Sequence, residues 1–204
     1  AAAWAASTFA ASGVYTELIS KATPTPLIMF HVERNPNFYG MAVTASHNPA
    51  IYNGIKLFQR GGGDANLDFT EDIESIICER KELSLPHMDF EEAKARGLIR
   101  MIDPTNAYLD NIMATLDTEA IRKRGLKVAF DPMFGVGRTP MLTLLYSLRC
   151  EADIIHAQRD PLFGGRLPAP TEYTLANLML HVREGNFDIG LATDGDADRL
   201  GVID

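Results

Sequence analysis

The 204-residue sequence has few cysteines, no excess of positive charge and no long apolar run. Its two cysteines, Cys78 and Cys150, are too few for a disulfide framework, so we expect small buried or half-buried thiols in a reducing, cytoplasmic setting. With 19 basic and 27 acidic residues, the net charge of −8 leaves no basic stripe for a nucleic-acid backbone. No apolar run reaches the roughly 18 residues that a membrane span needs, and the alanine-rich start lacks the basic region of a signal peptide. We therefore expect neither a nucleic-acid partner nor a membrane.

Internal repeats are absent too, and the sequence instead alternates patterns typical of strands and helices. Because strands and helices alternate along the chain, an α/β layered architecture is predicted in both halves. A polar stretch that ends at Pro104 predicts a boundary between two domains, residues 1–104 and 105–204. Expected strands cover residues 14–19, 39–45, 55–58, 99–102, 127–130, 152–156, 188–193 and 200–204. Expected helices cover residues 1–12, a short segment from Leu27, 68–77, 90–96, 107–116, 118–124, 140–148 and 171–184, with Asp68 and Glu71 as a capping box and Thr171 as a further cap.

Residues 194–199, with the sequence D-G-D-A-D-R, place three carboxylates within five positions. In a partly buried site, the repulsion among Asp194, Asp196 and Asp198 must be offset by a cation or by protonation. An extended strand at ~3.3 Å per residue would separate the outer two too widely to share an ion, so the segment must coil. An all-oxygen ligand set suits a hard cation such as Mg2+. The same Asp-Gly pair is also typical of a hairpin tip, where acidic side chains are simply solvated.

Ser46 follows an expected strand and precedes an Asn-Pro turn dipeptide, which predicts a hydroxyl on a loop. Such a hydroxyl can act as a nucleophile. A phosphorylated Ser46 would need cationic partners, for which Arg199 and Lys56 are candidates. Taken alone, a serine beside a histidine is more typical of a surface turn, and Lys56 of a solvated strand residue. Because this motif and the acidic motif occur in the same chain, we favour the interpretation of Ser46 as a nucleophile with cationic partners.

Two motifs together resemble the α-D-phosphohexomutases. Residues 44–58, T-A-S-H-N-P-A-I-Y-N-G-I-K-L-F, are similar to the phosphoserine loop of that family, and D-G-D-A-D-R is similar to its magnesium loop. The resemblance implies two three-layer α/β/α domains with mixed sheets, the first truncated at its N-terminus. It also implies that domains 3 and 4 of the same protein lie outside this chain, that the chain alone is inactive, and that an unpaired sheet edge remains.

The activity that the resemblance implies is an isomerase acting on a phosphorylated hexose. A phosphoryl group would pass between hexose 1-phosphate and hexose 6-phosphate through phosphorylated Ser46 and a hexose 1,6-bisphosphate intermediate. One Mg2+ would be held by Ser46 and the three aspartates, while Arg199 and Lys56 bind phosphate. His47 and Lys56 are both candidates for moving the hydroxyl proton.

Two other functions are compatible with the same motifs. A non-catalytic binding or interaction module of this fold would not take up phosphate on Ser46. A metal-dependent sugar phosphatase would release inorganic phosphate without exchanging isomers. Glucose, mannose and glucosamine phosphates are all substrates compatible with these motifs.

Overall fold

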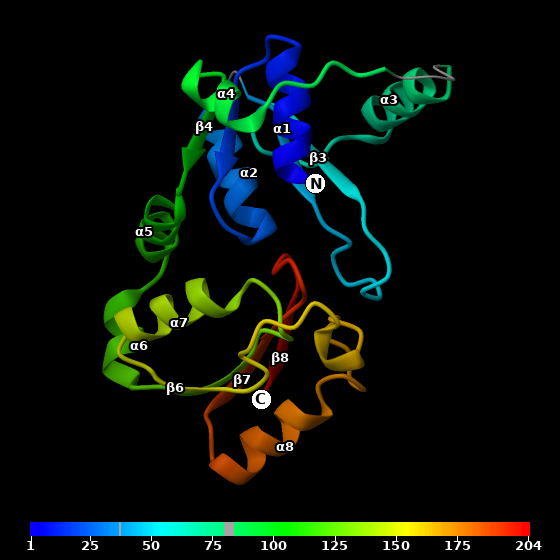
Figure 1. Cartoon of the computed structure of the whole chain (residues 1–204). Helices are drawn as coiled ribbons and strands as arrows, with labels where there is room; N and C mark the ends of the chain where they lie inside the picture. Colours follow the sequence, from blue (N-terminus) through cyan, green and yellow to red (C-terminus); the bar gives the residue numbers. More distant parts are fainter. Residues whose placement is uncertain (37, 80–83) are drawn as a thin grey trace. The chain divides into compact units, whose positions relative to one another are not determined.

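The computed structural model describes residues 1–36, 38–79 and 84–204, which form two compact units. Unit 1 contains Ala1–Ala22, Ile28–Val43 and Ile55–Pro104. Unit 2 contains Thr105–Asp204 together with two short segments from earlier in the chain, Thr23–Leu27 and Thr44–Gly54. Figure 1 follows the chain through its elements. The expected Ser46 loop therefore belongs to the same unit as the acidic motif.

The described strands of unit 1 pair two by two. β1 (Thr16–Ile19) runs parallel to β4 (Ile99–Ile102), and β2 (Gly40–Val43) runs antiparallel to β3 (Ile55–Phe58). Alanine-rich α1 packs on α4 because its small side chains permit a close approach. The helices are α1 (Ala2–Ala11), α2 (Thr25–Glu33), α3 (Leu67–Glu79) and α4 (Phe90–Ala95). The first residues of α2, up to Leu27, belong to unit 2.

Unit 2 is built on a four-stranded mixed sheet in the order β6-β5-β7-β8. β5 (Lys127–Asp131), β6 (Glu151–Ile154) and β7 (Ile189–Thr193) are parallel, and β8 (Leu200–Ile203) runs antiparallel to β7. The remaining elements are α5 (Thr105–Thr115), α6 (Thr118–Arg124), α7 (Arg138–Ser147), η1 (Phe163–Gly165) and α8 (Ala176–Gly185).

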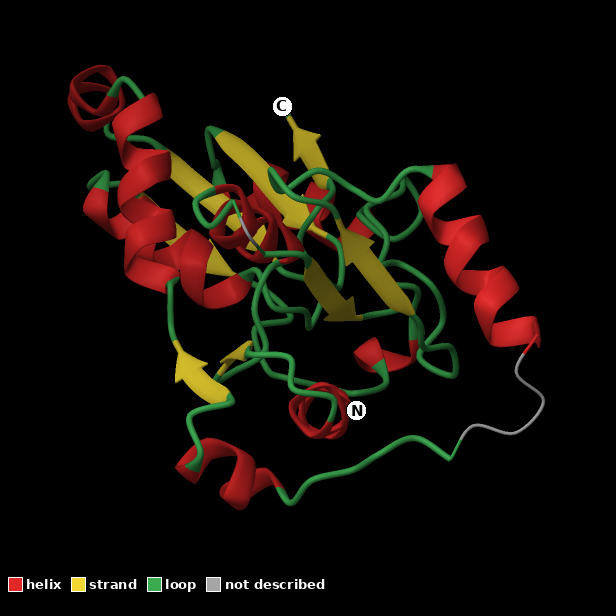
Figure 2. Cartoon of the chain, turned by 90° about the horizontal axis from the view of Figure 1, so that it is seen from above, coloured by secondary structure: helices red, strands yellow, loops and turns green. Residues whose placement is uncertain are grey.

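Helices cover both faces of this sheet. Val128 packs with Leu145 of α7 on one face, while its neighbour Ala129 packs with Leu178 of α8 on the other. Successive strand residues point to opposite faces, so the two clusters are separate cores of one α/β/α arrangement. Figure 1 shows strands of this sheet between α7 and α8, and Figure 2 shows the chain coloured by helices, strands and loops. The predicted α/β class with mixed sheets is confirmed.

Parallel strands place their carboxyl ends at one edge of the sheet. The loops that follow β5 and β7, residues 132–137 and 194–199, therefore lie next to each other, and their backbones are hydrogen bonded. This edge is where the acidic motif is built.

Among the described helices, α4 and α6 begin where the sequence predicts, and the other six starts differ by one to five residues. α2 begins at Thr25 rather than Leu27, because Pro26 fits the first turn, where its missing N–H is not needed. α3 is capped by Asn66, whose Oδ1 accepts the Phe69 N–H at 3.0 Å, so the Asp68 capping box is wrong.

α8 begins at Ala176, five residues after the expected cap at Thr171. The Thr171 N–H donates to the hydroxyl of Thr174 at 2.9 Å, and the two residues form a separate turn. Local side-chain bonds of this kind compete with helix formation.

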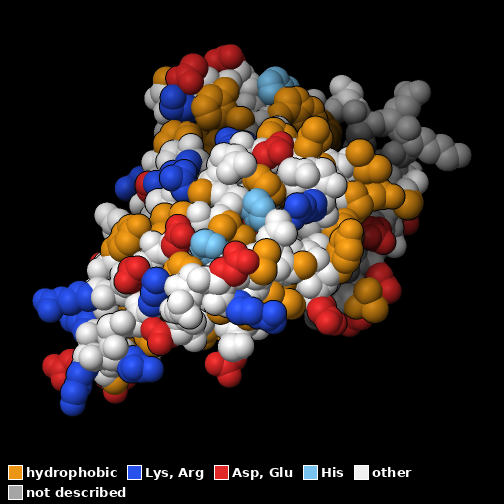
Figure 3. Space-filling model, turned by 90° about the horizontal axis from the view of Figure 1, so that it is seen from below, with side chains coloured by type: hydrophobic (Ala, Val, Ile, Leu, Met, Phe, Trp, Pro, Cys, Tyr) orange, Lys and Arg blue, Asp and Glu red, His pale blue; other side chains and the backbone are white. Residues whose placement is uncertain are grey.

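The two cysteines differ in their exposure. Cys150 is buried as expected, whereas Cys78 is exposed on α3, so the expectation of a buried or half-buried thiol is wrong there; both cysteines are free. On the face shown in Figure 3, basic and acidic side chains lie among one another. Of the helices in the described part of the chain, none has the length and apolarity to cross a membrane.

Candidate active site

Ser46 lies on the loop Thr44–Gly54, called the serine loop below, which joins β2 to β3. Its backbone is left-handed, with φ of 53°, a conformation that side chains with a Cβ disfavour. The Ser46 N–H donates to Thr44 Oγ1 at 2.8 Å, and the Asn48 N–H donates to the Ala45 carbonyl at 3.0 Å. These bonds fold the start of the loop into a turn that presents the serine hydroxyl.

The acidic loop, residues 194–199, connects β7 to β8 as the tip of an antiparallel hairpin in which Thr193 pairs with Leu200. Asp194 closes it from within: its Oδ1 accepts the backbone N–H groups of Asp198 and Arg199 at 3.0 and 3.1 Å. Ala197 takes a left-handed φ of 57° to complete the coil. The hairpin interpretation and the clustered-carboxylate interpretation therefore describe the same loop.

Glycines hold the acidic loop against its surroundings. The Gly195 N–H donates to the Pro168 carbonyl, and the Gly195 carbonyl accepts the Val136 N–H, both at 3.1 Å. A Cβ on Gly135 would lie 2.5 Å from the Gly195 oxygen, and one on Gly195 would lie 2.9 Å from the Ser46 carbonyl oxygen. Only glycine allows the two backbones to approach so closely, and the sequence around Gly135 carries no local sign of this packing.

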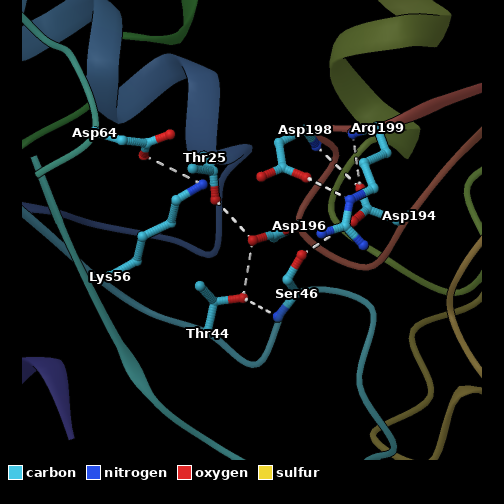
Figure 4. Close-up of polar contacts among 9 residues, drawn as sticks. All are labelled: Thr25, Thr44, Ser46, Lys56, Asp64, Asp194, Asp196, Asp198 and Arg199. Carbon is cyan, nitrogen blue, oxygen red and sulfur yellow. Dashed lines mark hydrogen bonds and ion pairs between the residues drawn. The ribbon is translucent and has the colours of Figure 1, made fainter. Parts of the chain in front are cut away.

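The serine and acidic loops meet through side chains within unit 2 (Figure 4). Ser46 Oγ donates to Asp194 Oδ2 at 3.2 Å across 148 positions of sequence. Thr44 Oγ1 and Thr25 Oγ1 each donate to Asp196 Oδ2 at 3.0 Å. The structure thus brings the nucleophile candidate into contact with the acidic cluster.

The three carboxylates of the acidic cluster have little access to water, so the repulsion among their charges is costly. Asp194 is fully buried, Asp196 is 6% exposed, and the Asp198 side chain is 18% exposed. Burial, with smaller contributions from the charges of Asp196 and Asp198, raises the pKa of Asp194 to about 6, and the hydrogen bond from the Arg199 backbone opposes that rise. A bound cation would offset the repulsion of the three charges.

The geometry fits such a cation. One carboxylate oxygen from each aspartate lies within 4.8 Å of the others. Asp196 Oδ1 is buried and has no hydrogen-bond partner among the described residues, which is costly unless a ligand satisfies it. Oxygen-only donors of this kind suit a hard divalent ion.

The other predicted site residues are placed as follows. His47 follows Ser46 and carries a buried Nδ1 that finds no hydrogen-bond partner in the described part of the chain. Arg199 is 47% exposed and its Nε lies 4.0 Å from Asp198 Oδ1. Lys56 lies on β3 in unit 1, where its ammonium pairs with Asp64 at 3.4 Å (Figure 4).

Two polar neighbours of the cluster, Thr25 and Thr44, were missed by the sequence analysis as site residues. Thr44 opens the quoted serine motif and Thr25 lies outside both motifs. In neither case does a hydroxyl carry a local sign of a carboxylate partner 171 or 152 positions away.

Comparisons with known proteins agree with this architecture. The phosphoglucomutase/phosphomannomutase family models match residues 1–84 as alpha/beta/alpha domain I and residues 106–204 as alpha/beta/alpha domain II. The phosphoglucomutase/phosphomannomutase of Thermococcus kodakarensis is 36% identical over 183 residues, which are 89% of this chain and 38% of that protein. The phosphoglucosamine/phosphogalactosamine mutase of Sulfurisphaera tokodaii is 32% identical over 89% of this chain and 39% of its own length.

A crystal structure of a Thermus thermophilus protein named as a phosphomannomutase superposes with a TM-score of 0.82. It is 29% identical, and the match covers 95% of this chain and 43% of that one. The chain therefore spans about two fifths of the length of these curated relatives. With both family domains matched over 1–84 and 106–204, the chain belongs to the phosphoglucomutase/phosphomannomutase family, the α-D-phosphohexomutases.

Proposed function

We propose that this chain supplies the phosphoserine and the magnesium site of a phosphohexomutase that interconverts hexose 1-phosphate and hexose 6-phosphate. The observation that carries the proposal is the 3.2 Å hydrogen bond from Ser46 Oγ to Asp194 Oδ2. Family membership supports the same reaction. Residues 1–104 and 105–204 are the proposed domains 1 and 2. Since the chain spans about two fifths of its relatives, the activity is proposed for the full-length protein with domains 3 and 4, and the chain alone is proposed to be inactive.

Ser46 is the proposed phosphate carrier. Its phosphoryl group passes to the free hydroxyl of the bound sugar phosphate, and the proton of that hydroxyl passes by way of His47 or Lys56 to the Ser46 oxygen that the phosphoryl group leaves. The sugar then carries two phosphates, turns over, and returns the other phosphoryl group to the Ser46 oxygen. Such transfers depend on positioning and on stabilising the charge of the transferring group.

The three aspartates and an oxygen of phosphorylated Ser46 are the proposed ligands of one Mg2+, which when bound neutralises charge on the transferring phosphoryl group. Asp194 is suited to this role because its two carboxylate oxygens have different partners. Oδ1 is held by two backbone N–H groups, and Oδ2 meets the serine hydroxyl. The loop is therefore shaped before any ligand arrives.

Arg199 and Lys56 are the proposed phosphate-binding cations. The half-exposed Arg199 guanidinium can present two N–H groups to a phosphate, a geometry that Lys56 cannot match. His47 and Lys56 are the two proposed groups for moving the hydroxyl proton. His47 adjoins the nucleophile in sequence, and its buried Nδ1 lacks a partner among the described residues.

Phosphate uptake by Ser46 tests the proposal. Full-length protein incubated with glucose 1,6-bisphosphate and Mg2+ is expected to gain the mass of one phosphate, and Ser46→Ala is expected to gain none. Ser147→Ala, an exposed serine at the end of α7 in the same unit, is the matched control and should be phosphorylated normally.

Each contrary outcome identifies a rival. No mass gain in the wild-type protein would contradict the proposal and favour a non-catalytic module of the same fold. Release of inorganic phosphate without interconversion of the two sugar phosphates would favour a metal-dependent phosphatase.

We also propose a cytoplasmic location for the protein, because its two cysteines are free.

A further inference from the structure

The carboxylate of Asp196 is held by two threonine hydroxyls on one oxygen only. Thr25 and Thr44 each donate to Oδ2 at 3.0 Å (Figure 4). Thr25 is 1% exposed, and its backbone N–H also donates to the Asp196 carbonyl at 2.9 Å. Oδ1 is buried without a hydrogen-bond partner among the described residues. The protein thus binds one oxygen of this carboxylate and leaves the other for a ligand.

This division matters because a carboxylate can otherwise rotate and offer either oxygen. Two donors on Oδ2 fix the carboxylate plane before a cation arrives. The hydroxyls are neutral, so they orient the ligand without adding a positive charge that would repel the ion. Neighbours that hydrogen bond to metal ligands in this way typically contribute about 10- to 100-fold to metal affinity or activity.

Thr44 has a second bond that Thr25 lacks. Its Oγ1 donates to Asp196 and accepts the Ser46 N–H at 2.8 Å, so one hydroxyl connects the acidic loop to the serine backbone. Ser46 adopts a left-handed φ of 53°, which is unfavourable for a residue with a Cβ unless other contacts hold it. The Thr44 bond is one of those contacts.

We infer that Thr25 and Thr44 are positioning residues of the cation site, and that Thr44 also positions the Ser46 nucleophile. The inference rests on the proposed function, because it concerns the same magnesium site. It separates the two threonines: loss of the Thr25 hydroxyl should affect the cation alone, while loss of the Thr44 hydroxyl should affect the cation and the serine.

The test removes each threonine hydroxyl while it keeps the shape of the side chain. Thr25→Val and Thr44→Val delete the hydroxyl, Thr25→Ser and Thr44→Ser keep it, and Mg2+ affinity of the full-length protein is measured by titration calorimetry. Each valine variant is expected to lower the affinity by about 10- to 100-fold, and each serine variant to retain most of it. Thr143→Val is the matched control, because the exposed Thr143 hydroxyl bonds, among the described residues, to the Thr139 carbonyl within α7 at 2.8 Å and not to the site.

A second measurement distinguishes the threonines. At saturating Mg2+, phosphate uptake by Ser46 is expected to slow by about 10-fold in Thr44→Val and to stay near the wild-type rate in Thr25→Val. Circular dichroism checks folding. If a valine variant does not fold, cysteine at that position keeps the size of the side chain and donates only weakly.

The outcomes separate this inference from the proposed function. Wild-type Mg2+ binding with unchanged affinity in both valine variants would overturn the inference and leave the proposed function intact. Equal losses in the serine and valine variants would also overturn it, since packing rather than the hydroxyl would be responsible. Absence of Mg2+ binding by the wild-type protein would overturn the proposed magnesium site, and the inference with it.

Discussion

The acidic loop and the serine loop meet at one site but are built differently. Asp194 and Asp196 of the acidic loop are buried, and the Gly195 backbone between them is bonded on both sides to neighbouring loops. The serine loop exposes its tip, with Ile51 at 86% and Tyr52 at 60% exposure, and its Asn48 and Tyr52 N–H groups bond within the loop itself. The difference indicates separate roles for the two loops. The pre-organised acidic loop is suited to bind the cation, and the serine loop, which is fixed at its start, presents the nucleophile.

The largest expected effect tests which loop dominates cation binding. Asp196→Asn keeps the side-chain shape but removes a charge and a ligand oxygen, so we expect Mg2+ affinity to fall by more than about 100-fold. Ser46→Ala, which removes only a neutral hydroxyl from the unphosphorylated protein, should change the affinity much less. Calorimetry on the two variants gives the comparison, and an equal or larger loss in Ser46→Ala would break it.

A smaller effect tests how firmly the acidic loop is held. In Gly135→Ala the new Cβ would lie 2.5 Å from the Gly195 carbonyl oxygen, so backbone must shift. We expect the free energy of unfolding to fall by about 1–3 kcal/mol, as for other overpacked sites, measured by urea denaturation. Gly63→Ala is the control, because nothing described lies within 4 Å of a Cβ there. Equal stability of the two variants would show that the loop yields easily.

The smallest effect concerns strain in the serine loop. Ser46→Gly and Ser46→Ala both lack the hydroxyl, so their difference isolates the backbone. Because glycine adopts φ of 53° freely, Ser46→Gly is expected to be more stable than Ser46→Ala by about 1 kcal/mol in urea denaturation. Equal unfolding free energies would mean that the left-handed turn stores no strain, and the serine loop would then resemble an ordinary turn.

Sequence patterns indicated the layout of the fold because each element has local signals. Strand β3 and helix α6 coincide with their predicted bounds, since a turn precedes the first and Gly125 ends the second. Cap positions were less reliable. At Asn66 and Thr171 several polar residues compete for the same role, and the sequence does not show which side chain reaches the backbone.

At the site, the acidic cluster could be inferred from charge alone, because three carboxylates so close in sequence need compensation. The hairpin and the carboxylate cluster do not exclude each other, because the three aspartates lie on the tip of the hairpin that β7 and β8 form. The threonine partners and the packing of Gly135 on Gly195 could not be inferred. Each depends on backbones that approach one another only after folding.

The most direct test of the account is the position of a bound ion relative to Ser46. Crystals of the full-length protein soaked with Mn2+ in place of Mg2+ would locate it by anomalous scattering. The account predicts one peak at about 2.1 Å from oxygens of the three aspartates and beside the Ser46 side chain. A peak elsewhere, or Ser46 standing apart from an ion held by the aspartates, would contradict it.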